Sequence, residues 1–330
     1  MTEAKPANPL ERLSALLRPD MDQVNALIYK RMDSEVPLIP QLAGYLIASG
    51  GKRMRPLLTL AATRLFSADN TRCFALAAAV EFIHTATLLH DDVVDESDQR
   101  RGKASANNVF GNQEAVLVGD FLFSRAFELM VEDGSLDVLR ILSKASAVIA
   151  EGEVLQLSVQ GNLETTFDQY TRIIGAKTAA LFAAATEIGP IVTDRTEMQQ
   201  NLRDYGYNLG MAFQIADDIL DYQADAAELG KAVGDDFKEG KMTAPVLFAL
   251  EKADKTEQQF WSDVFGKGDV TDSDLAKAKI LITKHGADKR SLDLAKDYAD
   301  RAAACLKDAP ESELKTLLIE AAYYSLERKN

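Results

Sequence analysis

Apolar residues recur at the spacing of α-helices along most of this chain, and no run of alternating β-branched residues indicates a strand. Alanine and leucine, which favour helices, are abundant, whereas proline is scarce, at 9 of 330 residues. We therefore predict an all-α fold. No linker rich in glycine, serine and proline divides the sequence, so we expect residues 1–330 to form a single large domain.

The helical pattern begins near Met21, and residues 1–20 are predicted to be a loosely packed lead-in. Thr166 and Ser135 are suitable N-caps for two of the helices. Residues 96–113 are polar and rich in Gly and Asn, so they are predicted to form a loop. The main predicted helices cover residues 41–48, 57–66, 72–95, 114–132, 135–160, 167–189, 196–223 and 242–252, with others up to the C-terminus.

Charge and composition exclude several classes of function. The formal net charge of -14 argues against nucleic acid as a partner, because phosphate backbones are bound by basic surfaces. Two isolated cysteines, Cys73 and Cys305, form neither a disulfide framework nor a zinc site. The N-terminus does not resemble a signal peptide, and no apolar stretch reaches 18 residues. We expect a cytoplasmic protein without a membrane span.

Two segments share the pattern Asp-Asp-x-x-Asp, and each follows a strongly apolar helical stretch. Residues four apart lie on the same face of a helix, so Asp91 is expected to stack with Asp95, and Asp217 with Asp221. Carboxylates this close repel one another unless a positive group offsets them. The complete set is Asp91, Asp92, Asp95, Asp217, Asp218 and Asp221.

Solvated helix ends are the ordinary explanation of one acidic cluster. Here the intervening residues, such as Val93 and Ile219, are apolar, so the aspartates border a buried face. The spacing of a calcium EF-hand is absent. Carboxylate oxygens suit hard cations, and magnesium held by few carboxylates keeps positions open for phosphate oxygens. The two clusters therefore predict magnesium ions around a diphosphate, where they would help it to leave.

Basic residues accompany the two clusters, in the segments Lys52–Pro56, Arg100–Gly102 and Lys231–Lys241. Each group alone could be ordinary surface charge. Lys177 lies in an otherwise apolar stretch, where a solvated role is less expected. His84 precedes Asp91 by two helical turns and could donate to a phosphate. Together, these residues provide the positive charge that two diphosphates in one cavity require.

At this point the chain resembles the trans-isoprenyl diphosphate synthases, and in particular the long-chain polyprenyl members. The resemblance covers about residues 42–246 and, more loosely, the remainder. It rests on the ordered segments GGKRMRP (50–56), EFIHTATLLHDDVVDESDQRRG (81–102), VGDFLFSRAFELM (118–130), AEGEVLQL (150–157), AKTAALF (176–182), AFQIADDILDY (212–222) and GKAVGDDFKEGKMTAPV (230–246).

The resemblance implies a helical bundle around a deep central cavity, usually in a homodimer, with about three Mg²⁺ ions per active site. It assigns the six aspartates to the metal ions and counts them, with Lys177, as catalytic. The allylic diphosphate would contact Arg100, Lys177, Thr178, Gln214, Lys231 and Lys241. Isopentenyl diphosphate would contact Lys52, Arg55, His84 and Arg101. Residues 103–105 read Lys-Ala-Ser where the family more often has proline and threonine, which affects loop stiffness rather than ligands.

The implied reaction adds isopentenyl diphosphate repeatedly to an allylic primer, farnesyl or geranylgeranyl diphosphate. Ala86 and Thr87 precede Asp91 by about one helical turn and are small, which in this family accompanies long products. Met130 and Leu142 are candidates for the tunnel floor. The pattern resembles octaprenyl and decaprenyl synthases (about C40–C50, closer to decaprenyl), which make ubiquinone side chains. Peripheral membrane contact could assist release of the product.

Three alternatives differ at identifiable residues. A terpene cyclase lacks the Gly-Lys-Arg-x-Arg-Pro segment and replaces the second aspartate cluster, whereas this chain has both features. A non-catalytic subunit of a heteromeric synthase would have lost one motif. A shorter-chain farnesyl or geranylgeranyl synthase would be distinguished by the size of its product.

Overall fold

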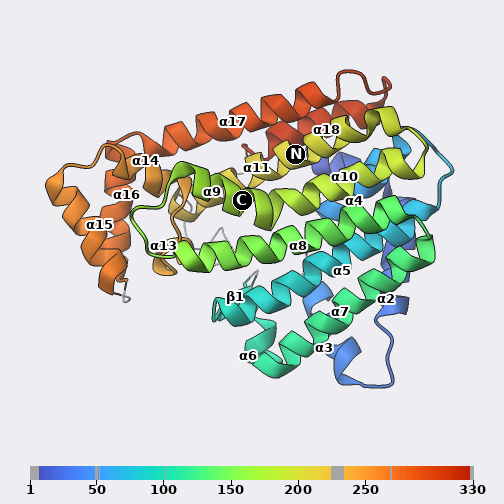
Figure 1. The fold of residues 1–330 in the computed structure, drawn as a ribbon, viewed down its shortest axis with the longest axis horizontal. Helices are drawn as coiled ribbons and strands as arrows, with labels where there is room; N and C mark the ends of the chain where they lie inside the picture. Colours follow the sequence, from blue (N-terminus) through green and yellow to red (C-terminus); the bar gives the residue numbers. More distant parts are fainter. Residues whose placement is uncertain are drawn as a thin grey trace, which may run out of the picture.

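The computed structural model describes residues 7–48, 51, 53–100, 102–223, 234–267 and 270–327. Nearly all secondary structure within these ranges is helical (Figure 1), which confirms the predicted all-α fold. The helices are α1 (Pro9–Leu16), α2 (Arg18–Arg31), α3 (Leu38–Ala48), α4 (Met54–Arg64), α5 (Arg72–Val94), α6 (Ala106–Phe110), α7 (Asn112–Asp133), α8 (Leu136–Val159), α9 (Phe167–Ile174), the π-helix η1 (Gly175–Ala179), α10 (Ala180–Val192), the 3-10 helix η2 (Thr196–Met198), α11 (Gln199–Gln223), α13 (Asp235–Lys238), α14 (Ala244–Leu250), α15 (Lys255–Lys267), α16 (Asp272–Lys284), α17 (Ala287–Cys305) and α18 (Glu313–Tyr324).

Helix α5 is the central element of the bundle and packs against α2, α4, α7 and α10. Its alanines at 77, 78 and 79 are fully buried, and small side chains at these positions let neighbouring helices approach closely. By length and composition α5 could cross a membrane, but 67% of its most apolar window is buried inside the protein. We therefore interpret α5 as a core helix.

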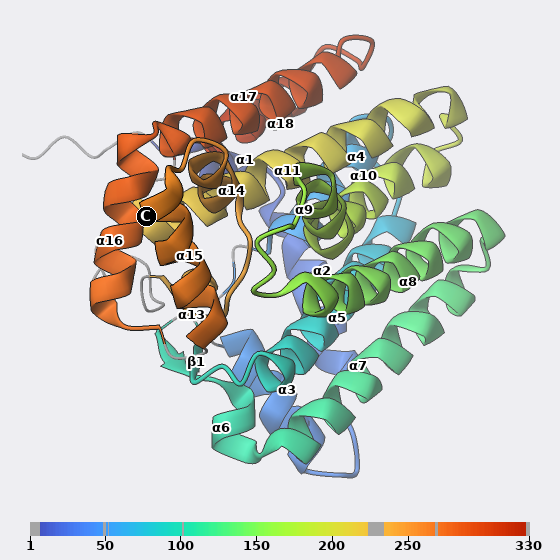
Figure 2. The same ribbon diagram turned by 60° about the vertical axis from the view of Figure 1, so that its left-hand side comes forward.

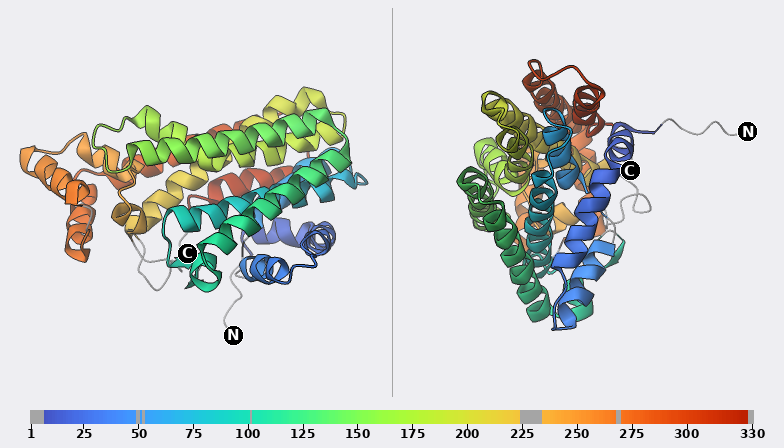
Figure 3. Two further views of the ribbon diagram at one scale, coloured as in Figure 1. Left: turned by 60° about the horizontal axis from the view of Figure 1, so that its bottom comes forward. Right: turned by 90° about the vertical axis from the view of Figure 1, so that its right-hand side faces the viewer.

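Two hydrophobic cores lie at the two ends of the described structure. One surrounds α4, α5, α7 and α10, and the other lies beneath α14, α15, α16 and α17. Helices α15 and α16 project from one end of the bundle, while α17 and α18 lie along one side (Figures 1 and 3). Helix α11 contacts both α10 and α17, so it connects the two cores.

The N-terminal prediction was wrong for residues 7–20. Helix α1 has a capping box in which Asn8 and Glu11 satisfy each other's backbone N–H groups. Its Leu13 is fully buried, and Arg64 forms an ion pair with Asp20 at 2.6 Å. An eight-residue helix shows too little periodicity to be recognised in sequence, and its order depends on packing against α4 and α18.

The predicted loop at 96–113 is more structured than expected. It contains the short antiparallel pair β1 (Gln99–Arg100) and β2 (Lys103–Ala104), followed by α6. Gly102 has a φ of 73°, which glycine adopts without the clash that a Cβ would cause. The hairpin directs Arg100 back toward the end of α5.

The helix predicted at 167–189 is divided into α9, η1 and α10, with Pro190 inside the last of these. Both predicted N-caps are confirmed: Thr166 accepts from the backbone N–H of Gln169, and Ser135 from that of Val138. The π-helix interrupts the regular spacing where Lys177 is located, and such single-turn insertions are frequent at functional sites.

Helices α10 and α11 approach closely at Gly206, where a Cβ atom would collide with the carbonyl oxygen of Phe182 and the hydroxyl of Thr186. We predict that Gly206→Ala lowers the free energy of unfolding by about 1–3 kcal/mol, because the helices must separate. Chemical denaturation measures the change. The control is Gly44→Ala in α3, where a Cβ meets no atom within 4 Å and stability should hold or rise. Equal stability of the two variants would contradict this packing argument.

Candidate active site

A cavity of about 720 Å³ opens between the C-terminal end of α5 and the middle of the bundle. Side chains from α4, α5, α8, α9, η1 and α11 line it, together with residues near α13. Figure 2 shows β1 and α13 at this same end of the molecule. Among the predicted site residues, Arg55, His84, Thr87, Asp91, Asp95, Arg100, Lys177, Thr178, Gln214, Asp217, Asp218 and Lys241 line this cavity.

The first aspartate cluster is divided between the cavity and the protein interior. Asp91 and Asp95 line the cavity, as their spacing of four residues predicts. Asp92 lies about 100° around the helix from Asp91 and is fully buried, where its Oδ1 accepts from Arg100 at 2.6 Å. The Asp92–Arg100 pair therefore ties the β1–β2 hairpin to α5.

The second cluster is divided in a similar way. Asp217 and Asp218 line the cavity and Asp221 does not, so the expected pairing of Asp217 with Asp221 on the cavity face was wrong. Asp218 and Asp221 are both buried, and Asp221 accepts from the backbone N–H of Gly234 at 3.2 Å. Asp218 is oriented by two donors: Tyr170 Oη lies 2.6 Å from its Oδ2, and Gln214 Nε2 lies 2.9 Å from its Oδ1. These contacts hold the Asp218 carboxylate in one orientation.

Lys177 projects into the cavity from η1 and pairs with Glu153 of α8 at 2.6 Å. Thr178, the next residue in η1, donates to Gln214 Oε1 at 2.7 Å. The π-helix thus supplies adjacent cationic and hydroxyl groups on the wall near both aspartate clusters. Glu153 was not singled out from the sequence, although an acidic residue in the largely apolar α8 was a signal that could have identified it.

Lys241 lies within 3.4 Å of Asp95 and 3.5 Å of Asp236, and it also pairs with Glu239. This lysine therefore connects the end of α5 to the segment after α13. The sequence interpretation did not assign Asp236 or Glu239, although both lie in a segment that carries the family resemblance. Their acidic charge beside a predicted phosphate-binding lysine was the available signal.

Elsewhere in the cavity lining, Arg55 of α4 lies 3.1 Å from the Nε2 atom of His84. The Arg55 guanidinium also lies over the ring of Phe182, 4.5 Å from its centre. The neighbouring Arg53 pairs with Glu81. These contacts place a second group of cations in the cavity, on helices other than the one that carries Lys177.

Burial and repulsion by neighbouring carboxylates raise the pKa values of Asp91 and Asp218. Burial raises the pKa of Asp91 to about 7, with a further contribution from Glu153 that Lys177 partly offsets. Burial and Asp236 raise the pKa of Asp218 well above its usual range, despite the donors Tyr170 and Gln214. Carboxylates are thus concentrated here beyond what the nearby side-chain cations neutralise.

At Lys241, by contrast, the neighbouring carboxylates outweigh the effect of burial on the pKa. Burial alone would lower the pKa of its ammonium group, but Asp236, Asp95 and Glu239 together raise it. Lys241 therefore stays charged, and it is surrounded by carboxylates.

The donor set suits a hard divalent cation, because it consists of carboxylate oxygens at a partly solvated cavity mouth. Within the described ranges, no three acidic, histidine or cysteine side chains already converge on one metal position. Asp91 and Asp95 at the end of α5 and Asp217 and Asp218 on α11 are therefore a divided set, and these four carboxylates are the residues that would hold divalent ions beside a phosphate group.

Some predicted residues lie elsewhere. Lys52, Arg101 and Lys231 fall outside the described residues. Among the candidate tunnel residues, Thr87 lines the cavity, whereas Ala86, Met130 and Leu142 are buried in the first hydrophobic core and do not border it. Their assignment to a tunnel stays a prediction.

Comparisons with known proteins agree with this geometry. The sequence profile of the family described as Polyprenyl synthetase matches residues 36–282. An octaprenyl diphosphate synthase of Haemophilus influenzae is 44% identical over 97% of both chains. The crystal structure of a polyprenyl synthase from Caulobacter crescentus, complexed with calcium and isoprenyl diphosphate, has a TM-score of 0.95 and 51% identity, covering 99% of this chain and 100% of that one. A decaprenyl diphosphate synthase structure from Rhodobacter capsulatus has a TM-score of 0.93 and 52% identity, covering 98% and 100%.

The helical bundle and its cavity with two aspartate clusters define an isoprenoid synthase fold. The chain belongs to the polyprenyl synthetase family and is a prenyltransferase. The resemblance stated from the motifs is therefore confirmed at the level of family, fold and enzyme class. Members of this family use a divalent metal, and the carboxylate donor set described above fits that requirement.

The Tyr170–Asp218 hydrogen bond is buried, so its removal has a measurable cost. We predict that Tyr170→Phe lowers the free energy of unfolding by about 1–3 kcal/mol. The buried Asp218 loses a hydrogen-bond donor, and water cannot fully replace that donor at a buried position. Thermal denaturation of both proteins tests this. The control is Tyr29→Phe, since the Tyr29 side chain is 59% exposed. A loss of stability no larger than that of the control would show that the contact is unimportant.

Proposed function

We propose that this protein is a magnesium-dependent, all-trans polyprenyl diphosphate synthase that adds isopentenyl diphosphate repeatedly to an allylic diphosphate. The supporting observation is one cavity in which carboxylates from both Asp-Asp-x-x-Asp motifs face Lys177, Lys241 and the Arg55–His84 pair. This arrangement provides carboxylates that would hold metal ions and separate cations that would bind two diphosphate groups. The long-chain relatives support a long product, about C40–C50.

About three Mg²⁺ ions would be held by Asp91, Asp95, Asp217 and Asp218, which line the cavity. Asp92 and Asp221 are buried behind these four carboxylates. When bound, the ions would neutralise the charge that develops on the departing diphosphate. Tyr170 and Gln214 keep Asp218 oriented toward this site. Because Asp92 forms an ion pair with Arg100, we expect it to hold the β1–β2 hairpin against α5.

The allylic diphosphate is assigned to the wall formed by η1 and α11. Lys177, Thr178 and Gln214 converge there, and Lys241 and Arg100 border the same space. Lys231 is proposed by resemblance to join them. To reach a phosphate, Lys177 must exchange its contact with Glu153 for the ligand. The more strongly charged diphosphate favours that exchange.

Isopentenyl diphosphate is assigned to Arg55 and His84, with Lys52 and Arg101 joining by resemblance. The two diphosphates would thus bind on separate walls, with their hydrocarbon parts between them. The allylic carbon–oxygen bond breaks, and the resulting cation is attacked by the isopentenyl double bond. A proton then leaves to the departed diphosphate, so no protein base is assigned. Apolar side chains such as Leu88, Ile174 and Phe213 border the cavity and limit water near the cation.

We further propose that the enzyme is a homodimer that acts in the cytoplasm and supplies the side chain of ubiquinone, from a farnesyl or geranylgeranyl primer. Support for the dimer comes from exposed apolar side chains on the adjacent helices α7 and α8, including Leu117, Val131, Val154 and Leu157. Several large exposed apolar side chains on neighbouring helices are typical of an interface. Peripheral membrane contact is proposed only for product release.

The activity itself is tested by sizing the product. Purified protein, labelled isopentenyl diphosphate, farnesyl diphosphate and Mg²⁺ should yield a polyprenyl diphosphate of about C40–C50, and chelation of the metal should stop the reaction. We predict that Asp217→Asn lowers turnover at least about a hundredfold with little change in stability. The control is the exposed Asp297→Asn on α17. A product no longer than geranylgeranyl diphosphate would favour the shorter-chain alternative, and unchanged turnover in Asp217→Asn would defeat the metal assignment.

Product length is tested at Thr87, which lines the cavity. We predict that Thr87→Phe stops elongation after about one or two isoprene units, because a phenyl ring would fill the space into which the growing chain passes. Mass spectrometry of the dephosphorylated products measures this. Ile280→Phe on α16, at a position that is 66% exposed, provides the control. Products of wild-type length from Thr87→Phe would show that the chain leaves by another route.

A further inference from the structure

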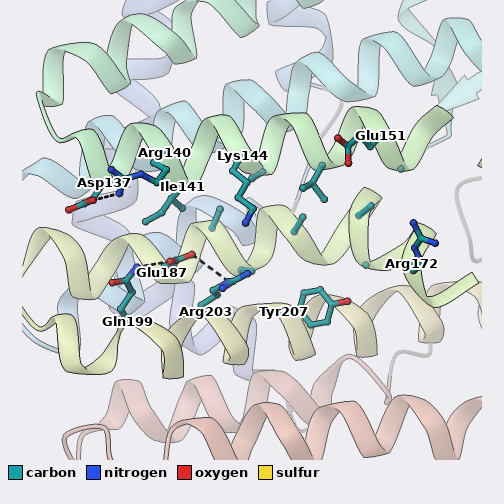
Figure 4. Close-up of a pocket in the computed structure, with 18 of the residues that line it drawn as sticks. Asp137, Arg140, Ile141, Lys144, Glu151, Arg172, Glu187, Gln199, Arg203 and Tyr207 are labelled. Atoms are coloured by element: carbon teal, nitrogen blue, oxygen red, sulfur yellow. Dashed lines mark hydrogen bonds and ion pairs between the residues drawn. The ribbon is translucent and has the colours of Figure 1, made fainter. Parts of the chain in front are cut away.

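A second cavity, of about 570 Å³, lies on the outer face of the bundle. Helix α8 forms one of its sides and α11 the other, while α10 and η1 form its floor (Figure 4). The floor consists of the small residues Gly175, Ala176, Ala180, Ala183 and Ala184, and Gly152 of α8 adjoins it. We call this cavity the outer groove. No role is assigned to it by the function proposed above.

The rim of the outer groove carries a small excess of positive charge, four basic against three acidic side chains, within an acidic protein. Arg140, Lys144, Arg172 and Arg203 line it, against the acidic residues Asp137, Glu151 and Glu187, whereas the whole chain has a net charge of -14. Arg140 pairs with Asp137, and Arg203 approaches Glu187 only to 3.9 Å. Lys144 and Arg172 form no ion pair within the described part of the chain. Two cations are therefore available to an anionic ligand.

The space between these cations is apolar. Ile141, Ala145, Val148 and Leu155 of α8 line it along the helix, opposite the alanines of α10. A charged rim with an apolar floor suits a ligand that has an anionic head and a slender hydrocarbon tail. A membrane surface is a poorer match, because the apolar side chains lie in a concavity that a bilayer cannot enter.

The outer groove adjoins the active site directly. On η1, Gly175 and Ala176 face the groove while Lys177 and Thr178 face the active-site cavity. On α8, Gly152 and Glu153 divide in the same way. A single layer of backbone therefore separates the two spaces, and it carries the Glu153–Lys177 ion pair.

That layer has no free space. A Cβ at Gly152 would lie 2.5 Å from the Cβ of Ala176, and a Cβ at Gly175 would lie 2.5 Å from Tyr207 Oη. A molecule that wedges between α8 and η1 must therefore move one of them, because close-packed elements do not deform smoothly. Lys177 would then shift relative to the aspartates, and allylic diphosphate would bind less tightly.

We propose that the outer groove is a second binding site for an isoprenoid diphosphate, whose occupancy weakens binding of the allylic substrate at the active site. Lys144 or Arg172, at one end of the apolar space, would hold the diphosphate, and the apolar residues between these two cations would hold the hydrocarbon chain. The identity of the ligand rests on the proposed function, because isoprenoid diphosphates are its substrates and products. The binding geometry rests only on the groove itself.

The test counts binding sites with the unreactive thiolo analogue of farnesyl diphosphate in equilibrium dialysis with Mg²⁺. Wild-type protein should bind two molecules per chain. Lys144→Glu/Arg172→Glu should bind one molecule, at the active site, and its affinity for the molecule in the outer groove should be at least about tenfold lower. The control is Lys30→Glu/Lys289→Glu, which makes the same change in net charge at two exposed lysines outside the groove and should retain both sites. Circular dichroism melts confirm that each variant folds.

Kinetics provide the second readout. The wild-type rate should approach its maximum over a wider range of allylic diphosphate concentration than a single site gives, whereas Lys144→Glu/Arg172→Glu should keep the wild-type kcat and follow single-site saturation. One bound molecule in the wild type, or two in the groove variant, would overturn the proposal. If inorganic pyrophosphate competes for the outer groove as well as the farnesyl analogue does, the apolar floor does not contribute to binding and the proposal fails. If the wild type binds phosphatidylglycerol vesicles and Lys144→Glu/Arg172→Glu does not, the groove is a lipid site instead. Absence of any polyprenyl product, with two sites still counted, would refute the proposed function but not the second site.

Discussion

The concentration of carboxylates at the mouth of one cavity is the constraint on which the rest of the site depends. Burial raises the pKa of Asp91 to about 7 and that of Asp218 well above its usual range. Such a cluster is costly in a metal-free protein, and the fold accommodates it with buried donors and with lysines that approach from other elements. The excess of negative charge that destabilises the site without a metal also favours the binding of divalent cations and, through them, of diphosphates.

The scaffold places these groups through close helix contacts rather than through loops. Small residues such as Gly152 and Gly206 let α8 approach η1, and α10 approach α11. The π-helix then turns Lys177 and Thr178 into the cavity beside Gln214. Because the layer between the cavity and the outer groove is only one backbone thick, a change on the outer face has a short mechanical route to Lys177. Catalysis and its proposed regulation therefore depend on the same contact between α8 and η1.

Sequence reasoning succeeded where a property is local. Helical periodicity identified α5, α7, α8 and α11 to within a few residues, and the N-caps Ser135 and Thr166 were recognised from their own chemistry. It failed at α1, where order comes from burial of Leu13 against distant helices. It also could not anticipate the hairpin that returns Arg100 to Asp92, because the pairing depends on the hairpin's fold rather than on residue type.

By itself, the sequence determined an all-α chain with two acidic motifs, the cations that accompany them and the family to which the chain belongs. Tertiary structure alone decided that Asp91, Asp95, Asp217 and Asp218 face the cavity while Asp92 and Asp221 turn inward. It also brought in Glu153, Tyr170 and Asp236. The physical reason is that residue type and spacing specify the face of a single helix, whereas the partner of that face depends on how distant helices pack together.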